Sequence, residues 1–429
     1  MHKQKKNPIS TKILLIIAIL LVFIAVTITI LHLVKKYTNK EAEGVSLTDG
    51  NLIINYNNGN KIKITKNKEY LYDIHLTNSS NEKIYYTITL HSTKSSNLDL
   101  VLLDSEQNEI ESYSDFIGEK DIVLLKTLEP SSSATYYLKF NPNKTRFEGE
   151  ISIHNESVNS LSFADLILLN NNVNKEKPKL SEPSTKDEGL LAGSDNDGVS
   201  YYFRGNVKNN YAKINDTLYR IVRINGNGNV RLIMDNALPN KLPYNSNSLI
   251  EGADTKTLAT YEGSSLESEL IGWYNQELAG YDSVIDYDIF CTDLDFIITD
   301  ETINRYSVSY QRIYNEKSPS FTCSENNISR SKIGLITADE IIYAGGNINK
   351  ANKSYYLYKK ELSSNYLTMT SYYINSNNNV TMMNVKPTGE LGEGILVTNN
   401  SLIRPVININ SRAKVKGTGT DIDPYIIVP

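Results

Sequence analysis

Histidine, the side chain most often used for acid–base catalysis and zinc binding, is scarce in this chain and confined to its first part. The 429 residues include five histidines, at His2, His32, His75, His91 and His154. Beyond residue 154 the chain therefore has no histidine general base and no histidine metal ligand. This excludes most zinc-dependent and histidine-based hydrolase chemistry from the larger part of the sequence.

The only two cysteines are Cys291 and Cys323, 32 positions apart. In an exported domain such a pair forms a disulfide far more often than a metal site or a reactive thiol. We therefore predict a Cys291–Cys323 disulfide, which would stabilise the fold by roughly 3–4 kcal/mol on the chain-entropy model.

Acidic residues give one weak metal signal. The run Asp195-Asn196-Asp197-Gly198 has the alternating oxygen ligands and the glycine turn of a calcium loop, but position 206, where a bidentate glutamate would close an EF-hand, is asparagine. Asp195 and Asp197 are thus weak calcium candidates, and calcium is the one cofactor that the sequence leaves open. We find no phosphate-binding glycine motif and no catalytic constellation, so neither a nucleotide nor a catalytic residue is expected.

Tyrosine dominates the aromatic residues, with 29 tyrosines against nine phenylalanines and one tryptophan. A tyrosine offers a flat face and a hydroxyl group, which suit sugars or protein partners. For each candidate tyrosine the alternative role is packing in the core. For Arg404, the one arginine among the candidates, the alternative role is a structural ion pair. The candidate ligand-binding residues are Tyr355, Tyr356, Tyr366, Tyr372, Tyr373 and Arg404.

Length and charge set the broad class. A chain of this length predicts two or three domains, and 40% hydrophobic with 22% charged residues is typical of globular proteins. The net charge of −5 argues against nucleic acid as a partner, because phosphate binding needs a basic surface.

Residues 13–34 form an apolar run without a charged side chain. As a helix this run would span roughly 33 Å, enough to cross a bilayer. It exceeds the roughly 7–15 apolar residues of a cleaved signal peptide, so we predict a transmembrane signal anchor. Residues 1–12 would then be a cytoplasmic stub at the cell membrane, with the bulk of the chain extracellular, as the predicted disulfide also indicates.

Two domains are predicted after the anchor. Residues 45–155 alternate with period two, which favours an all-β, Ig-like sandwich acting as a spacer, with 52–56 and 61–65 as a hairpin around Asn57–Asn60. Residues 156–188 are expected to be a short helix and a linker, and residues 189–429 an α+β domain.

Within the α+β domain the strongest local signals are one hairpin and two helices. Residues 218–224 and 230–234 flank an Asn-Gly-rich turn. A helix is expected over 264–278, with Trp273 on its apolar stripe and therefore in the core. A second helix begins at Thr337, with Glu340 completing a capping box and Gly345 ending the helix.

Several spaced motifs in residues 187–429 resemble a family of uncharacterised surface proteins from gut-dwelling low-GC bacteria. They include Val199–Val207 (VSYYFRGNV), Tyr219–Asn225 (YRIVRIN), Ile333–Gly346 (IGLITADEIIYAGG) and Arg404–Ile409 (RPVINI). That family resembles, more distantly, the fold shared by formylglycine-generating enzymes and C-type lectins, which implies a C-type-lectin-like domain. The cysteines precede the helix at Thr337 and the calcium-binding triplets of the lectins are absent, so neither activity carries over.

The sequence as a whole predicts a multidomain, membrane-anchored bacterial cell-surface binding protein. It would be an adhesin or recognition module for a glycan or protein ligand outside the cell, attached to the membrane through its N-terminal helix. One alternative is a structural envelope component that docks to another membrane protein. Another is an enzyme of unknown type, which would need two carboxylates lining one pocket.

Overall fold

The computed structural model describes residues 45–64, 70–94, 98–116, 120–142, 147–156, 161–247, 255–298, 305–324 and 327–429. The chain divides into two compact units, Met1–Ser157 and Val158–Pro429, and strands far outnumber helices among the described residues of both. The predicted stub and signal anchor lie outside the described residues. Within the described residues, no helix is long and apolar enough to cross a membrane.

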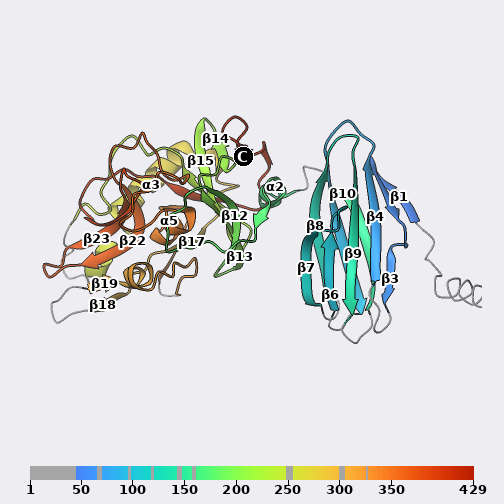
Figure 1. Cartoon of the computed structure of the whole chain (residues 1–429). Helices are drawn as coiled ribbons and strands as arrows, with labels where there is room; N and C mark the ends of the chain where they lie inside the picture. The colour runs from blue at the N-terminus through green and yellow to red at the C-terminus, as the bar shows by residue number, and fades with distance from the viewer. Residues whose placement is uncertain are drawn as a thin grey trace, which may run out of the picture. The chain divides into compact units, whose positions relative to one another are not determined.

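The first unit is a sandwich of two antiparallel sheets (Figure 1). The six-stranded sheet has, in spatial order, β1 (Val45–Asp49), β2 (Leu52–Tyr56), β4 (Tyr70–Asn78), β9 (Ser133–Pro142), β6 (Leu98–Leu103) and β7 (Glu109–Phe116). The four-stranded sheet has β3 (Lys61–Ile64), β10 (Phe147–Glu156), β5 (Ile84–Lys94) and β8 (Lys120–Leu128). Alternate residues of both sheets fill one shared core, as period-two patterning predicts. The sandwich prediction is confirmed, although sheets of six and four strands differ from the seven- or nine-stranded immunoglobulin pattern.

The hairpin predicted around Asn57–Asn60 is wrong. Strands β2 and β3 both form, but β2 pairs with β1 and β4, whereas β3 pairs with β10 of the other sheet. The connection therefore carries the chain from one sheet to the other, with Asn57 Nδ2 donating to Asp73 Oδ2 at 2.7 Å. Crossing over lets both strands bury their apolar side chains in the shared core, which a local hairpin signal does not encode.

The second unit is built from three sheets and a few short helices. Its largest sheet contains β11 (Val173–Asn174), β12 (Asp187–Asp195), β13 (Gly198–Gly205), β15 (Thr217–Ile224), β14 (Tyr211–Ile214), β27 (Tyr425–Ile427) and β26 (Val415–Lys416), with β16 (Val230–Met234), β25 (Val406–Ile409) and β21 (Ile333–Gly334) joined through β15. A five-stranded sheet has the order β18 (Phe296–Ile298), β19 (Arg305–Ser307), β22 (Tyr366–Ile374), β23 (Val380–Val385) and β24 (Leu391–Leu396), and β17 (Asp288–Cys291) pairs with β20 (Ile328–Ser331). The predicted β15–β16 hairpin is confirmed.

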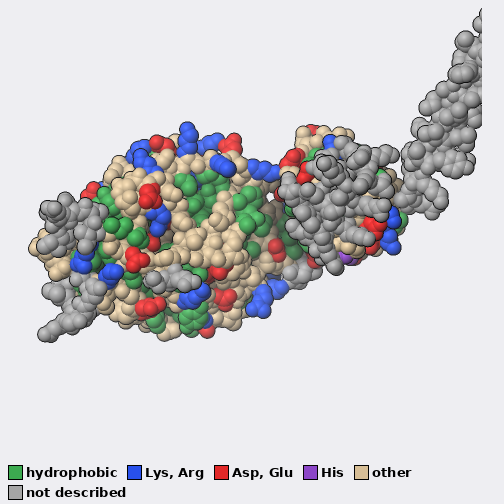
Figure 2. Space-filling view, turned by 90° about the horizontal axis from the view of Figure 1, so that it is seen from below, with side chains coloured by type: hydrophobic (Ala, Val, Ile, Leu, Met, Phe, Trp, Pro, Cys, Tyr) green, Lys and Arg blue, Asp and Glu red, His purple; other side chains and the backbone are tan. Residues whose placement is uncertain are grey.

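The helical segments of this unit are short. The α-helices are α2 (Phe163–Asn170), α3 (Ser265–Glu277), α4 (Val308–Tyr310) and α5 (Ala338–Ala344); a π-helical turn η4 (Gln311–Asn315) continues α4, and η2 (Thr255–Ala259) and η3 (Ala279–Tyr281) are 3₁₀ turns. On the face of the molecule in Figure 2, hydrophobic side chains of this unit show in several patches among polar and charged side chains.

The segment predicted as a linker is part of the second unit, which begins at Val158 rather than at residue 189. Helix α2 packs its Phe163 ring against Tyr425 near the end of the chain, with ring centroids 5.3 Å apart. Asn170 Nδ2 donates to the Tyr425 hydroxyl at 2.9 Å. A polar, Pro-containing composition indicates a linker, but here tertiary contacts fold it onto the domain that follows.

Both predicted helices form where their caps place them. Ser264 caps α3, and the Thr337–Glu340 capping box of α5 is present in both directions. The side chain of Trp273, expected in the core, is only partly buried. The buried stripe of α3 instead consists of Leu266, Leu270 and Tyr274.

We predict opposite effects for alanine at two glycines. Gly345 ends α5 at φ +113°, and a Cβ there would collide with the Ser184 side chain, so Gly345→Ala should lower the free energy of unfolding. Gly272 lies within α3 with open space around it, so Gly272→Ala should raise the same quantity by about 0.5–1 kcal/mol. Urea unfolding of the full chain measures both, and a stabilised Gly345→Ala variant would contradict the assigned cap.

Candidate functional site

Most of the candidate ligand-binding residues are buried. The exposed fractions of Tyr355, Tyr356 and Tyr366 are 1%, 2% and 3%, and that of Arg404 is 1%. The Tyr355 hydroxyl donates to the Gly389 carbonyl at 2.9 Å. Rings enclosed in this way offer no face to a ligand, so for these three tyrosines the packing alternative applies.

Arg404 is a structural cross-brace. Its guanidinium donates to the backbone carbonyls of Met234 at 3.0 Å, Leu357 at 2.9 Å and Asp235 at 3.1 Å. The burial of Arg404 contradicts the predicted contact with a ligand. Among the described residues, its guanidinium bonds to carbonyl oxygens instead of forming the ion pair that was the alternative prediction.

The other two candidates, Tyr372 and Tyr373, lie in a different place, beside three tyrosines that the sequence analysis missed. Ring centroids follow one another from Tyr373 to Tyr306 at 5.6 Å, from Tyr306 to Tyr310 at 4.4 Å, and from Tyr310 to Tyr314 at 4.6 Å, all with nearly parallel planes. We call Tyr373, Tyr306, Tyr310 and Tyr314 the tyrosine row. All four are partly exposed, and the more buried Tyr372 packs edge-on behind them.

Local structure explains the row. Strand β19 pairs with β22 so that Tyr306 stands opposite Tyr373. The chain then turns helically through α4 and η4, and residues four apart on a helix share one face, which places Tyr310 and Tyr314 next in line. The four-residue spacing of Tyr310 and Tyr314 is the available sequence signal, but it indicates a shared face only where a helix is expected, and none is expected from the sequence over these residues.

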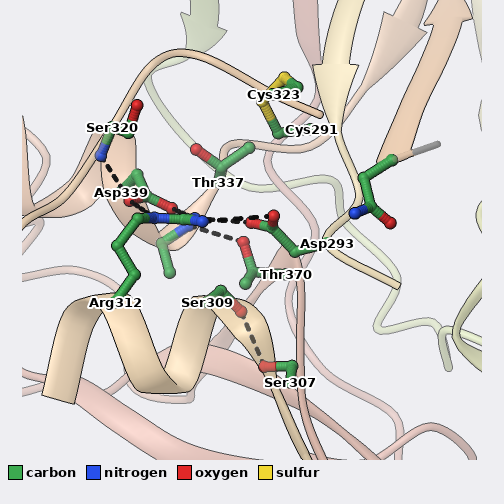
Figure 3. Close-up of polar contacts among 12 residues, drawn as sticks. Cys291, Asp293, Ser307, Ser309, Arg312, Ser320, Cys323, Thr337, Asp339 and Thr370 are labelled. Atoms are coloured by element: carbon green, nitrogen blue, oxygen red, sulfur yellow. Dashed lines mark hydrogen bonds and ion pairs between the residues drawn. A yellow bond between two sulfur atoms is a disulfide. The ribbon is translucent and has the colours of Figure 1, made fainter. Parts of the chain in front are cut away.

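A buried ion-pair cluster anchors this helical turn (Figure 3). The Arg312 guanidinium donates from Nη2 to Asp293 Oδ2 at 2.7 Å, and from Nε and Nη2 to the two oxygens of Asp339 at 2.9 and 2.5 Å. Only 5% of the Asp293 side chain and 2% of the Asp339 side chain are exposed. Removing one partner of such a buried group typically costs about 3–5 kcal/mol, because it leaves an uncompensated charge.

Serine hydroxyls add a second attachment on the same turn. Ser307 Oγ and Ser309 Oγ donate to the Ser371 carbonyl at 2.8 and 3.2 Å, and Ser371 Oγ donates to the Asp293 carbonyl at 3.0 Å. These hydrogen bonds attach the start of the helical turn, which carries Tyr310, to strand β22.

The predicted disulfide is confirmed: Cys291 and Cys323 are bonded, with their Cα atoms 5.5 Å apart. Cys291 ends β17 two residues before Asp293, and Cys323 lies three residues after Ser320, whose N–H donates to Asp339 Oδ1 at 2.8 Å. The bond therefore closes the segment that contains the anchored turn.

A second buried cluster contains Asp195, one of the two calcium candidates. Asp195 Oδ2 accepts from Arg223 Nη1 at 2.6 Å and from the Gly226 N–H at 2.9 Å, while Asp195 Oδ1 accepts from the Asp197 N–H. Asp195 is thus committed to an arginine, and Asp197 is exposed. Across the described ranges, no three His, Cys, Asp or Glu side chains gather into a metal-binding group, so neither residue belongs to such a group.

The paired carboxylates that an enzyme would need form ion pairs with arginines in this structure. Asp293 and Asp339 share Arg312, and Arg223 lies between Asp195 and Glu340, with its Nε donating to Glu340 Oε1 at 3.2 Å. Burial by itself would raise the pKa of Glu340, but the charges of Arg231 and Arg223 outweigh burial and hold that pKa below the usual glutamate value. These carboxylates are structural ion-pair partners in this arrangement.

A cavity of about 210 Å³ opens at the Tyr314 end of the tyrosine row. Its apolar lining includes Leu180, Ile313, Tyr314, Pro319, Ile342 and Ile348, and its polar lining Ser181, Glu182, Lys317, Asn347, Asn349 and Lys350. The buried Arg204 joins two of the lining segments, because its guanidinium donates to the Glu182 carbonyl at 2.9 Å and to the Ile342 carbonyl at 2.7 Å.

Three of the four hydroxyl groups of the row are not buried and have no partner among the described residues. Within the part of the chain that the structure describes, the hydroxyls of Tyr306, Tyr310 and Tyr373 make no hydrogen bond. Burial raises the pKa of Tyr310, with a smaller contribution from Tyr306, so its hydroxyl stays protonated well above neutral pH. A neutral phenol can both donate and accept hydrogen bonds.

No protein-family model and no curated protein matches the chain. Among solved structures, a family 35 carbohydrate-binding module from Clostridium thermocellum is similar over 26% of this chain and 97% of its own length, with 12% identity and a TM-score of 0.17. A CBM4 structure covers 29% of this chain and 83% of its own length, with 6% identity and a TM-score of 0.16. The enzymatically active domain of bacteriophage CBA120 tailspike protein 4 covers 25% and 20%, with 7% identity and a TM-score of 0.15. At such TM-scores and identities the likenesses assign no function to this chain.

We predict that removing the disulfide destabilises only the second unit. The double variant Cys291→Ser/Cys323→Ser should lose about 3–4 kcal/mol of unfolding free energy in that unit, because the unfolded chain gains the entropy of an open 32-residue loop. The sandwich has no cysteine and serves as the internal control. Urea unfolding followed by hydrogen exchange separates the units, and unchanged protection in the second unit would contradict the prediction.

Acid should weaken the same unit through Glu340. Because its pKa is lowered in the folded state, its stabilising contribution is complete above the unfolded glutamate pKa of about 4.3 and is lost as the pH falls through the folded value. Glu340→Gln should lower stability at pH 7 by about 3–5 kcal/mol and flatten the dependence below pH 4.5. Unfolding free energies at pH 7 and pH 3.5 test this, and parallel curves for both proteins would count against it.

Proposed function

We propose that this chain is a membrane-anchored bacterial cell-surface binding protein, and that its second unit recognises glycans through the tyrosine row. One observation carries the proposal: four partly exposed tyrosines stand in a line, and none of their hydroxyls has a hydrogen-bond partner within the described residues, that of Tyr314 being buried. A line of aromatic groups with unsatisfied hydroxyls suits an extended ligand that is rich in hydrogen-bonding groups.

The stacking of the rings favours a glycan over an apolar ligand. Because neighbouring planes in the row are within 28° of parallel and the centroids are 4.4 to 5.6 Å apart, the facing sides of the rings are stacked with an offset and are partly covered. The ring edges and hydroxyls are left for a ligand. A polymer with many hydroxyl groups can use them, whereas a flat apolar ligand would need the covered faces.

The rigidity of the row supports binding. Arg312 fixes the turn to Asp293 and Asp339, and the serine hydroxyls fix the turn to β22. Side chains held in place before a ligand arrives lose little conformational freedom on binding, and this lowers the cost of association.

The remaining parts of the proposal concern location. Residues 13–34 would anchor the chain with its N-terminus in the cytoplasm, and the sandwich would act as a spacer that holds the second unit away from the membrane. The resemblance of residues 187–429 to bacterial surface proteins with a C-type-lectin-like domain supports an adhesin or recognition role.

We predict that the row, and no exposed tyrosine elsewhere, is required for binding. The full-length chain, in mild detergent, is titrated against mucin, peptidoglycan fragments and polysaccharides. Tyr306→Ala/Tyr310→Ala should weaken binding by about tenfold or more, because truncated hot-spot aromatics lose roughly 1.4 kcal/mol or more. Tyr287→Ala is the matched control, since Tyr287 is 67% exposed and lies outside the row.

A chelator should leave this affinity unchanged, because Asp195 is held by Arg223. Absence of binding to every glycan by the unaltered chain would overturn the proposal. The row would then favour a protein ligand, or an envelope component that docks to another membrane protein.

A further inference from the structure

We infer that the 210 Å³ cavity at the end of the tyrosine row is a subsite for a single sugar unit that carries a carboxylate. The inference rests on the proposed function and extends it, because Tyr314 both ends the row and lines the cavity. A chain bound along the row would therefore reach the cavity with its last unit.

The size of the cavity selects one small unit. Typical small-molecule sites occupy about 300–1,000 Å³, so a cavity of about 210 Å³ admits one small ring rather than an oligomer. Its lining is mixed, with Ile313, Ile342 and Ile348 on the apolar side and lysines on the polar side. A sugar ring has this same division between C–H faces and polar edges.

The charges of the side chains that line the cavity favour an anionic ligand. Glu182 Oε2 and Lys350 Nζ form an ion pair at 2.7 Å, which neutralises one lysine. Lys317 makes no ion pair or hydrogen bond with any described residue, although its charge, after that of Lys350, helps to lower the pKa of Glu182. The lining therefore carries one uncompensated positive charge, and a carboxylate is its natural complement.

Two further features point to a ligand here. The Tyr314 hydroxyl is buried without a hydrogen-bond partner, alone in this respect among the described residues that line the cavity. Lys317 is held at φ +52°, a left-handed conformation that is strained for a residue with a side chain. Strain of this kind persists where surrounding structure fixes a side chain in position, and it clusters at ligand sites.

The walls are fixed before binding. Arg204 joins the Glu182 carbonyl to the Ile342 carbonyl, and Asn347 Nδ2 donates to the Ser181 carbonyl at 3.1 Å. Segments far apart in the sequence are thus locked around the space, so the cavity is part of the folded unit rather than a gap between mobile loops.

The test compares a neutral oligosaccharide that binds the full-length chain with the same oligosaccharide ending in a uronic acid. The unaltered chain should prefer the acidic form by about tenfold, the effect of one charge-assisted hydrogen bond. Lys317→Gln should abolish this preference while retaining the affinity for the neutral form. Lys208→Gln, which removes the same charge from an exposed lysine that does not line the cavity, should leave the preference intact.

The outcomes separate this inference from the proposed function. Equal affinity for the two forms, or a preference that survives in Lys317→Gln, would overturn the subsite and leave glycan binding by the row in place. A second variant, Ser181→Phe, adds bulk to the cavity lining without changing charge and should also remove the preference. A terminal sugar 6-phosphate that binds as tightly as the uronic acid would overturn the carboxylate assignment.

Discussion

The position of the tyrosine row depends on one guanidinium, that of Arg312, paired with two buried carboxylates. The segment that carries the row consists of the short strand β19, which pairs with β18 and through two residues with β22, and of a helical turn. Structures of this length are not stable alone. Arg312 compensates by joining the turn to Asp293 after β17 and to Asp339 on α5. Because Asp293, Arg312 and Asp339 come from separate segments of the chain, their ion pairs hold the helical turn in place against the rest of the unit.

The same physical device recurs throughout the second unit. Arg204, Arg231 and Arg404 are each at most 1% exposed and donate largely to backbone carbonyls. A unit with many short strands leaves carbonyl groups without ladder partners, and the planar, multidentate guanidinium satisfies several of them at once. Burial lowers the pKa of Arg231, and the nearby charge of Glu340 opposes this effect.

The proposed recognition surface combines two kinds of contact. The tyrosine row offers neutral hydroxyls and ring edges. The cavity beside Tyr314 offers an apolar part of its lining and the charge of Lys317, which has no ion-pair partner among the described residues. The first kind suits any sugar chain, whereas the second distinguishes one terminal unit from another. Affinity and specificity are thereby assigned to different residues of one continuous surface.

The sequence by itself determined the elements with strong local signals. Period-two patterning gave the sandwich strands, and capping residues gave the ends of α3 and α5. The cysteine pair gave the disulfide, because only one pairing exists. These features depend on neighbouring residues or on a unique combination, so no knowledge of the tertiary structure was needed.

Only the tertiary structure decided which residues form the candidate site. Crowding in sequence drew attention to Tyr355, Tyr356 and Tyr366, yet burial assigns them to the core, and Tyr373 joins Tyr306 across two paired strands. The cavity likewise requires a supposed linker to fold back onto the end of α5. Such contacts join residues more than sixty positions apart, and their energy comes from burial and ion pairing in the assembled unit, which a local pattern of residue types does not contain.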